Sequence, residues 1–184
     1  MRTQRNERNR RQRGFTLIET ALATVIVGVG VLSMVAAQVA FHRQNSWSTH
    51  ASIAERLGNE IREITLNLPR FDPVTGNAVW GVEDGEVTLA DYDDVDDFDG
   101  DGEGLVFSAA LGNGPINARR EIISDMTGWT QVVLVRNVDP YDVMAEDVAD
   151  GSSDMVMVEV VVTYQGPNDL DPLEMTRVTW ITPD

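Results

Sequence analysis

An uncharged run of 22 residues, at positions 20–41, constrains this chain more than any other feature of its sequence. A helix of that length, at about 1.5 Å per residue, crosses the hydrocarbon core of a bilayer, which is about 30 Å thick. Residues 1–14 precede the run with six arginines and one acid, Glu7, and positive charge of this kind stays on the cytoplasmic side. We therefore expect a helix that crosses the inner, or cytoplasmic, membrane once and exports the residues after it.

Three classes of amino-terminal segment fit these residues to different degrees. A cleaved secretory signal has a shorter apolar core, of about 7–15 residues, which disfavours that class. A signal anchor without processing has the right length and charge. It leaves Glu19 unexplained, because an acid in an apolar segment is costly and usually functional. The third class, a processed precursor, accounts both for Glu19 and for the glycine at position 14.

Residues 14–19 read Gly-Phe-Thr-Leu-Ile-Glu. With the apolar run behind them, they resemble the processing signal of type IV prepilins and of type II secretion pseudopilins. The resemblance implies that prepilin peptidase cleaves between Gly14 and Phe15 and N-methylates Phe15. It also implies that Glu19 pairs with the terminal amine of a neighbouring subunit, since an ammonium and a carboxylate desolvated together cost less than either alone.

The function that this resemblance implies is structural. The chain would be a minor pilin or pseudopilin, assembled with other pilin or pseudopilin subunits into a type IV pilus-like or type II secretion filament, in the periplasm or outside the cell. Gly28 matches a glycine near which pilin helices unwind in filaments, although the proline that many major pilins carry further on is absent. A small residue also lets helices pack closely, and both interpretations of Gly28 are open.

A second helical pattern follows the apolar run. Its apolar residues recur at spacings of three and four, which is typical of an amphipathic helix that packs on a partner. They are Ile53, Leu57, Ile61, Ile64 and Leu68. Pro69 should end the helix, because proline disfavours helix at the residue before it. We expect one helix from about residue 15 to about residue 68.

The rest of the chain is rich in β-branched residues separated by Gly, Pro, Asp and Asn, which predicts short strands joined by turns. We expect strands at 104–108, 129–138, 155–164 and 175–181. The expected fold is α+β and pilin-like: a long amino-terminal transmembrane and amphipathic helix packed on a small antiparallel sheet. Its parts would be a leader (1–14), a transmembrane and assembly helix (15–41), an amphipathic helix (42–68) and a β-rich head (69–184).

An acidic loop at 82–104 holds eleven acids and no base. Within it Asp97, Asp99 and Asp101 alternate before a glycine, as in the first half of an EF-hand loop, although position twelve would be Ser108 and not glutamate. One interpretation is a solvated loop with Asp-Gly turns. The other is calcium held by Asp97, Asp99, Asp101 and Glu103; no other cofactor is expected.

Composition excludes several classes of function. The chain has no lysine and a net charge of −16, which becomes −21 when the +5 leader is removed, and so acidic a surface repels nucleic acid. Cysteine is absent, so no disulfide and no thiol nucleophile exist. His42 and His50 are too far apart in sequence for a helical metal pair. We find no catalytic motif and expect no enzyme.

The four tryptophans, at 47, 80, 129 and 180, are expected in the core or at an interface and not in a sugar platform. Two hypotheses from different classes remain. One is the structural filament subunit, and the other is a membrane-anchored, calcium-binding adhesive or ligand-binding module. No residues support a membrane-tethered hydrolase.

Overall fold

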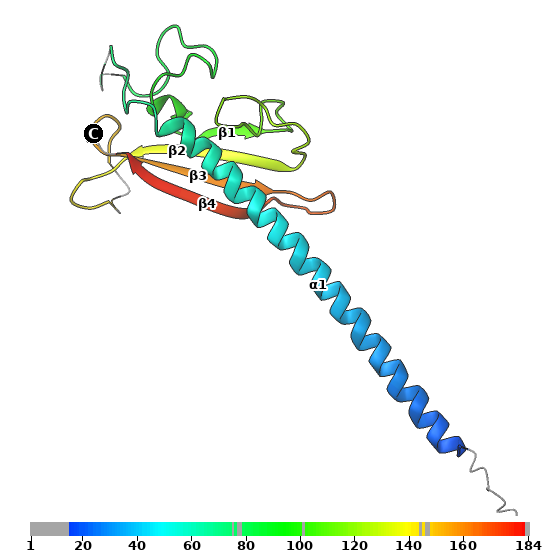
Figure 1. The fold of residues 1–184 in the computed structure, drawn as a ribbon. Coiled ribbons are helices and arrows are strands. Elements are labelled where there is room, and N and C mark those ends of the chain that lie inside the picture. The colour runs from blue at the N-terminus through cyan, green and yellow to red at the C-terminus, as the bar shows by residue number, and fades with distance from the viewer. Residues whose placement is uncertain are drawn as a thin grey trace, which may run out of the picture. The chain divides into compact units, whose positions relative to one another are not determined.

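The structure is a computed structural model, and it describes residues 15–74, 76, 79–100, 102–143, 145 and 148–182. One long amino-terminal apolar helix, α1 (Leu17–Thr65), precedes a four-stranded antiparallel sheet, which confirms the predicted pilin-like α+β fold (Figure 1). The chain forms two compact units, Met1–Ser46 and Trp47–Asp184, and α1 contributes residues to both.

Helix α1 matches the expected helix except at its ends. The sequence predicts helix to residue 68, but Leu66–Leu68 form a turn in which Leu68 N–H donates to the carbonyl of Thr65 at 3.2 Å. This early end has a simple cause, since the residue before Pro69 is pushed out of the helical region. Gly28 and Gly30 lie inside α1 without a break, and a Cβ added at either would meet open space.

The sheet is a simple meander in the order β1-β2-β3-β4, with every neighbouring pair antiparallel. Its strands are β1 (Leu105–Ser108), β2 (Trp129–Asn137), β3 (Val156–Tyr164) and β4 (Leu173–Thr182). All four predicted strands are confirmed, with ends that shift by one or two residues. A short 3-10 helix, η1 (Asp96–Asp99), lies between α1 and β1 in the chain.

The core of the head forms where the carboxyl-terminal part of α1 packs on one face of the sheet (Figure 1). Burial alternates along β2 and β3, so one face of each strand points to the helix. Of the predicted helical stripe, Leu57, Ile61 and Ile64 are buried, and Ile53 and Leu68 are half-buried against the core. The predicted amphipathic stripe is therefore confirmed.

One glycine sets the closeness of this packing. A Cβ added at Gly58 would lie 2.7 Å from Cγ2 of Val178 on β4, nearer than carbon atoms approach in proteins. Gly58 is buried and lies between Leu57 and Ile61 in the packed part of α1. The helix can therefore approach β4 closely only because this position has no side chain.

A buried glutamine, Gln131, ties three parts of the head together. Its side chain is fully buried on β2. Nε2 donates to the carbonyls of Leu57 (2.9 Å) and Ile116 (3.1 Å), and Oε1 accepts from the N–H of Ile116 (2.8 Å). Gln131 thereby joins α1, β2 and the loop after β1 by hydrogen bonds that water cannot reach.

Three of the four tryptophans lie in or against the core, and His50 contacts two aromatic residues. Trp129 and Trp180 are buried and Trp80 is half-buried against the core, as predicted, whereas Trp47 is exposed. The ring of His50 lies 5.7 Å from that of Trp129, between centroids, and also stacks near Tyr164. His50 is therefore half-buried and part of an aromatic group.

Candidate functional site

The first candidate region is the amino-terminal end of α1. Gly14, the predicted cleavage position, lies outside the described residues, and Phe15 directly after it is exposed. Thr16 caps the helix: its N–H and its hydroxyl both donate to Oε2 of Glu19 at 2.9 Å. The N–H of Glu19 donates back to the hydroxyl of Thr16 at 3.4 Å. This reciprocal pattern is a capping box, which the Thr-x-x-Glu spacing could have predicted and which sequence reasoning missed.

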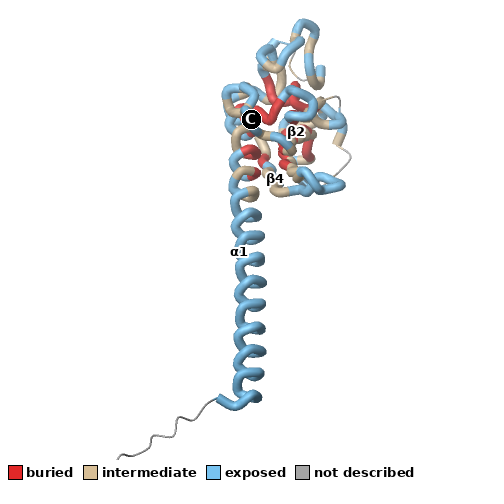
Figure 2. Tube along the Cα trace, turned by 90° about the vertical axis from the view of Figure 1, so that its right-hand side faces the viewer, coloured by how far each residue is buried: buried red, intermediate tan, exposed pale blue. Residues whose placement is uncertain are grey.

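The helix behind this cap has no partner within its own unit. Every residue from 15 to 46 is exposed (Figure 2). Large apolar side chains point in all directions around it, with exposed fractions of 46% or more from Phe15 to Phe41. Among the described residues α1 is the one helix long and apolar enough to cross a membrane. A helix that is apolar all round is stable only in a membrane or among other helices.

The second candidate region is the acidic segment before β1. Residues Asp94, Val95, Asp96, Asp97 and Phe98 are fully buried. The interpretation of this segment as a solvated loop is therefore wrong for its centre. The cause lies in the apolar residues between the acids: Phe98 and Val95 belong to the core, and the N–H of Val95 donates to the carbonyl of Pro69 at 3.0 Å. Burying these anchors draws the neighbouring carboxylates inside.

Two groups of carboxylates share Asp97. Oxygen atoms of Glu83, Asp94 and Asp97 lie within 4.8 Å of one another, and so do oxygen atoms of Glu86, Asp93 and Asp97. We call these five residues the acidic cluster. Asp94 and Asp97 are fully buried, Glu83 and Glu86 are half-buried, and Asp93 is exposed. The cluster therefore extends from the core to the surface.

Backbone amides hold the two buried aspartates in place. Oδ2 of Asp97 accepts from the N–H of Asp93 (2.9 Å) and of Asp94 (3.2 Å), and Oδ1 of Asp94 accepts from the N–H of Asp97 (3.1 Å). Their other oxygens, Oδ2 of Asp94 and Oδ1 of Asp97, are buried and have no hydrogen-bond partner. Oδ1 of Asp96 is also buried without a hydrogen-bond partner. Buried polar atoms without partners are rare in proteins and need an explanation.

Burial and mutual repulsion change the acidity of these groups. Desolvation, together with the closeness and charge of the Asp96 carboxyl group, raises the pKa of Asp94 to about 8. Desolvation and the charge of Asp94 raise the pKa of Asp97 to about 7, and desolvation raises the pKa of Asp96 to about 6. The charged forms of these side chains are therefore unfavourable in the protein alone.

The predicted calcium ligands are not all brought together. Asp97 lies in the acidic cluster, but Asp99 and Glu103 belong to neither group of carboxylates among the described residues, and Asp101 lies outside these residues. Oδ2 of Asp99 accepts instead from Nε1 of Trp80 at 3.0 Å, and Glu103 is exposed. The difference arises because residues 96–99 form a 3-10 helix and not an extended EF-hand loop.

Arg120 holds the backbone segment that precedes Asp93 of the acidic cluster. Nη1 of Arg120 donates to the carbonyls of Tyr92 (2.7 Å) and Leu89 (2.8 Å), and at 3.4 Å to that of Ala90. Its charge is thus directed at the backbone before Asp93 and not at the carboxylates. Arg120 itself adopts a positive φ of 63°, an uncommon conformation for a residue with a side chain.

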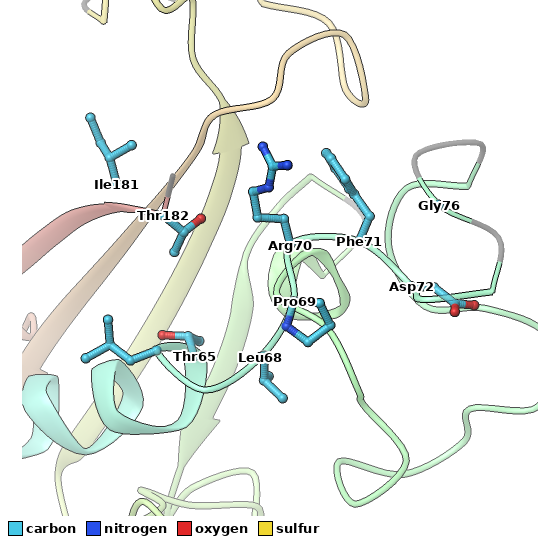
Figure 3. A pocket seen from close by; sticks show the side chains of 10 residues that line it. Thr65, Leu68, Pro69, Arg70, Phe71, Asp72, Gly76, Ile181 and Thr182 are labelled. Atoms are coloured by element: carbon cyan, nitrogen blue, oxygen red, sulfur yellow. The ribbon is translucent and has the colours of Figure 1, made fainter. Parts of the chain in front are cut away.

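A pocket of about 510 Å³ lies beside the end of α1 (Figure 3). Arg70 and Phe71 lie side by side there, with the guanidinium carbon 5.4 Å from the ring centroid. Its described lining residues include no histidine. The lining residues are Thr65, Leu66, Leu68, Pro69, Arg70, Phe71, Asp72, Gly76, Ile181 and Thr182.

Comparison with known proteins bears on the first region. Residues 9–35 match the family model described as the prokaryotic N-terminal methylation motif. This match covers the predicted cleavage position and the first 16 of the 22 residues of the apolar run. Neither a curated protein nor a solved structure matches the chain.

Proposed function

We propose, from the prokaryotic N-terminal methylation motif, that this chain is a precursor of the pilin or pseudopilin type, which prepilin peptidase processes and which assembles with other pilins. We propose that this chain is a minor pilin or pseudopilin that builds its apolar helix into the shared core of a filament and displays an acidic head. The observation that carries the proposal is the motif at 9–35 together with the helix that begins inside it at Leu17, whose apolar side chains are exposed on every side from residue 17 to residue 41.

Two environments satisfy such a helix in turn. Before assembly, the apolar residues face lipid tails, and the motif and helix are compatible with a membrane-anchored precursor. In a filament, the same residues would face the helices of neighbouring subunits. Glu19 would then meet the amine of Phe15 of the next subunit, and this attraction would favour one register between subunits.

Mass spectrometry of the mature protein tests the processing step. The chain is produced with and without a co-expressed prepilin peptidase. With the peptidase, we expect an amino terminus at Phe15 that carries one extra methyl group, and without it the uncut precursor. A bulky substitution, Gly14→Val, should block cleavage. A mature amino terminus at any other residue would overturn the assignment.

Incorporation into filaments tests the structural role. Because the chain has no cysteine, one cysteine introduced at the exposed Asp150 gives a unique label in the head. We expect the label in sheared filaments of a strain that makes the other subunits, and its loss from them when the peptidase is absent. Label that stays in the membrane fraction of both strains would favour the second candidate function.

That second candidate is a membrane-anchored module that binds calcium and an outside partner through its acidic segment. The buried carboxylates of the acidic cluster favour its calcium-binding part. The two functions are compatible in one chain, since one uses the amino-terminal helix and the other uses the head.

A further inference from the structure

We propose that Glu83, Asp94 and Asp97 bind a calcium ion, with Glu86 and Asp93, which also lie near Asp97, as further ligands. This set shares only Asp97 with the ligands expected from the sequence. The proposal goes beyond the filament function and does not rest on it, because it concerns only residues of the head.

The strongest support comes from two buried oxygens. Oδ2 of Asp94 and Oδ1 of Asp97 belong to fully buried side chains and accept no hydrogen bond. The other oxygen of each carboxylate is held by backbone amides, so neither side chain is free to turn toward water. An ionised oxygen in this position requires a positively charged partner.

The distances between the carboxylates fit a calcium ion. Calcium binds oxygen at about 2.3–2.6 Å, so two of its ligands are at most about 5 Å apart. The oxygens of Glu83, Asp94 and Asp97 lie within 4.8 Å of one another, and those of Glu86, Asp93 and Asp97 meet the same limit. One ion in either group can therefore reach several carboxylates at once.

The described arginines do not supply the missing positive charge. In the part of the chain that the structure describes, no arginine forms an ion pair with Asp94, Asp96 or Asp97, and the whole sequence has no lysine. Arg120, near in the fold, gives its hydrogen bonds to backbone carbonyls. When these carboxylates are ionised, a cation from solution is thus the remaining source of charge compensation.

The ligand chemistry selects the kind of cation. The cluster offers only carboxylate oxygens, which suit hard ions and not zinc or copper. Carboxylates that bind in one-oxygen or two-oxygen fashion suit the six to eight flexible ligands of calcium, whereas magnesium demands a tight octahedron and keeps much of its water. We therefore expect calcium to bind more tightly than magnesium.

Thermal unfolding of the full chain in detergent micelles tests the proposal. After treatment with a chelator, calcium at about 100 times its Kd should raise Tm by about 5–10 °C. Magnesium at the same ionic strength should raise it much less. Asp94→Asn and Asp97→Asn should each weaken calcium binding at least about tenfold, because affinity follows the number of charged ligands. Both variants should unfold in chelator at or above the wild-type temperature, because one repulsive charge is gone.

Asp84→Asn is the matched control. It removes the same charge from the same segment, but Asp84 is exposed and lies outside the acidic cluster, so its calcium response should equal that of the wild type. Equal effects of calcium and magnesium, or an equal loss of response in Asp84→Asn and Asp94→Asn, would show screening of an acidic surface and overturn the site.

A second measurement does not depend on folding stability. Terbium is a luminescent substitute for calcium that nearby aromatic side chains can excite. Trp80 lies three residues before Glu83 in the chain, and Tyr92 directly precedes Asp93. We expect terbium emission that calcium displaces and that Asp97→Asn reduces at least about tenfold in affinity. Emission that calcium cannot displace would place terbium at another site, and no emission at pH 7.5 would mean that protons and not a cation neutralise these carboxyls. Either result would overturn the calcium site.

Discussion

The carboxylate of Glu19 accepts hydrogen bonds from both the N–H and the hydroxyl of Thr16, each at 2.9 Å. Glu19 therefore caps its own helix, in addition to the pairing with a neighbouring subunit that the pilin resemblance implies. The two roles need different properties. A cap needs only an acceptor oxygen, which glutamine also provides, whereas pairing with an ammonium needs a negative charge.

Glu19→Gln separates the two roles. We expect this variant to keep the cap and to enter the membrane as well as the wild type does, but to be depleted from filaments at least about tenfold, since the charge pair is lost. Glu19→Ala should be depleted to a similar extent. Quantitative immunoblotting of membrane and filament fractions gives both values.

Thr16→Ala is the control for the cap. It removes the hydroxyl that donates to Glu19 and leaves the charge in place, and the loss of a cap costs about 1 kcal/mol. A helix anchored in a membrane tolerates this loss, so Thr16→Ala should reach filaments. If Glu19→Gln assembles normally and Thr16→Ala does not, the cap is the function of Glu19 and the charge pair is not.

Gln131→Leu should destabilise the head although it makes the core more apolar. The N–H of Ile116 loses its acceptor and stays buried, which costs about 1–3 kcal/mol. In a chain of this length that cost lowers Tm by several degrees. Circular dichroism in detergent measures it. The same change at the exposed Gln165 should have a much smaller effect, and a stabilised Gln131→Leu would show that this hydrogen-bond network is dispensable.

The periodic parts of this fold could be predicted from the sequence. Apolar residues recur every three or four positions from Ile53 to Leu68, and β-branched residues fill β2 and β3. The first pattern predicts a helix and its buried face, and the second predicts strands. Gln131 could not be recognised as a buried residue, because its partners lie 15 and 74 residues away and no local pattern encodes them.

The acidic segment shows the limit of motif reasoning. Spacing suggested that Asp97, Asp99 and Asp101 act together, as in an EF-hand loop. The packing of Val95 and Phe98 instead turns this stretch into a short helix, and Asp97 meets Glu83 and Glu86 from a part of the chain that spacing could not connect to it. Which carboxylates meet is thus decided by the buried apolar residues between them.

Arg120→Ala should weaken both the head and its calcium response. The guanidinium joins the carbonyls of Leu89 and Tyr92, and hydrogen bonds from a charged group contribute about 1.5–3 kcal/mol. Without it the backbone that leads to Asp93 is less ordered. Thermal unfolding with and without calcium measures both effects. Arg119→Ala, which breaks only an exposed ion pair with Glu121, should change neither, and equal effects of the two substitutions would contradict this positioning role.

The pH dependence of stability in chelator should reflect the titration of the buried Asp94, Asp96 and Asp97. The folded-state pKa values of Asp94, Asp97 and Asp96, about 8, 7 and 6, lie above the ordinary value of 3.8. Between about pH 4 and pH 8 these groups bind more protons in the folded chain than in the unfolded chain. The free energy of unfolding must therefore fall as pH rises through this range. The contribution is complete below about pH 4 and is lost as pH passes through the folded-state values.

We therefore expect Tm in chelator to fall between pH 5 and pH 8. Asp94→Asn should reduce the slope, because the group with the highest pKa no longer titrates, whereas Asp84→Asn should keep it. Repulsion across the whole acidic surface also lowers Tm in this range, and it is common to both variants, so their difference isolates the cluster. Saturating calcium should reduce the fall in the wild type, since the ion replaces the protons. Identical slopes for the two variants would contradict the burial of these carboxyls in the folded head.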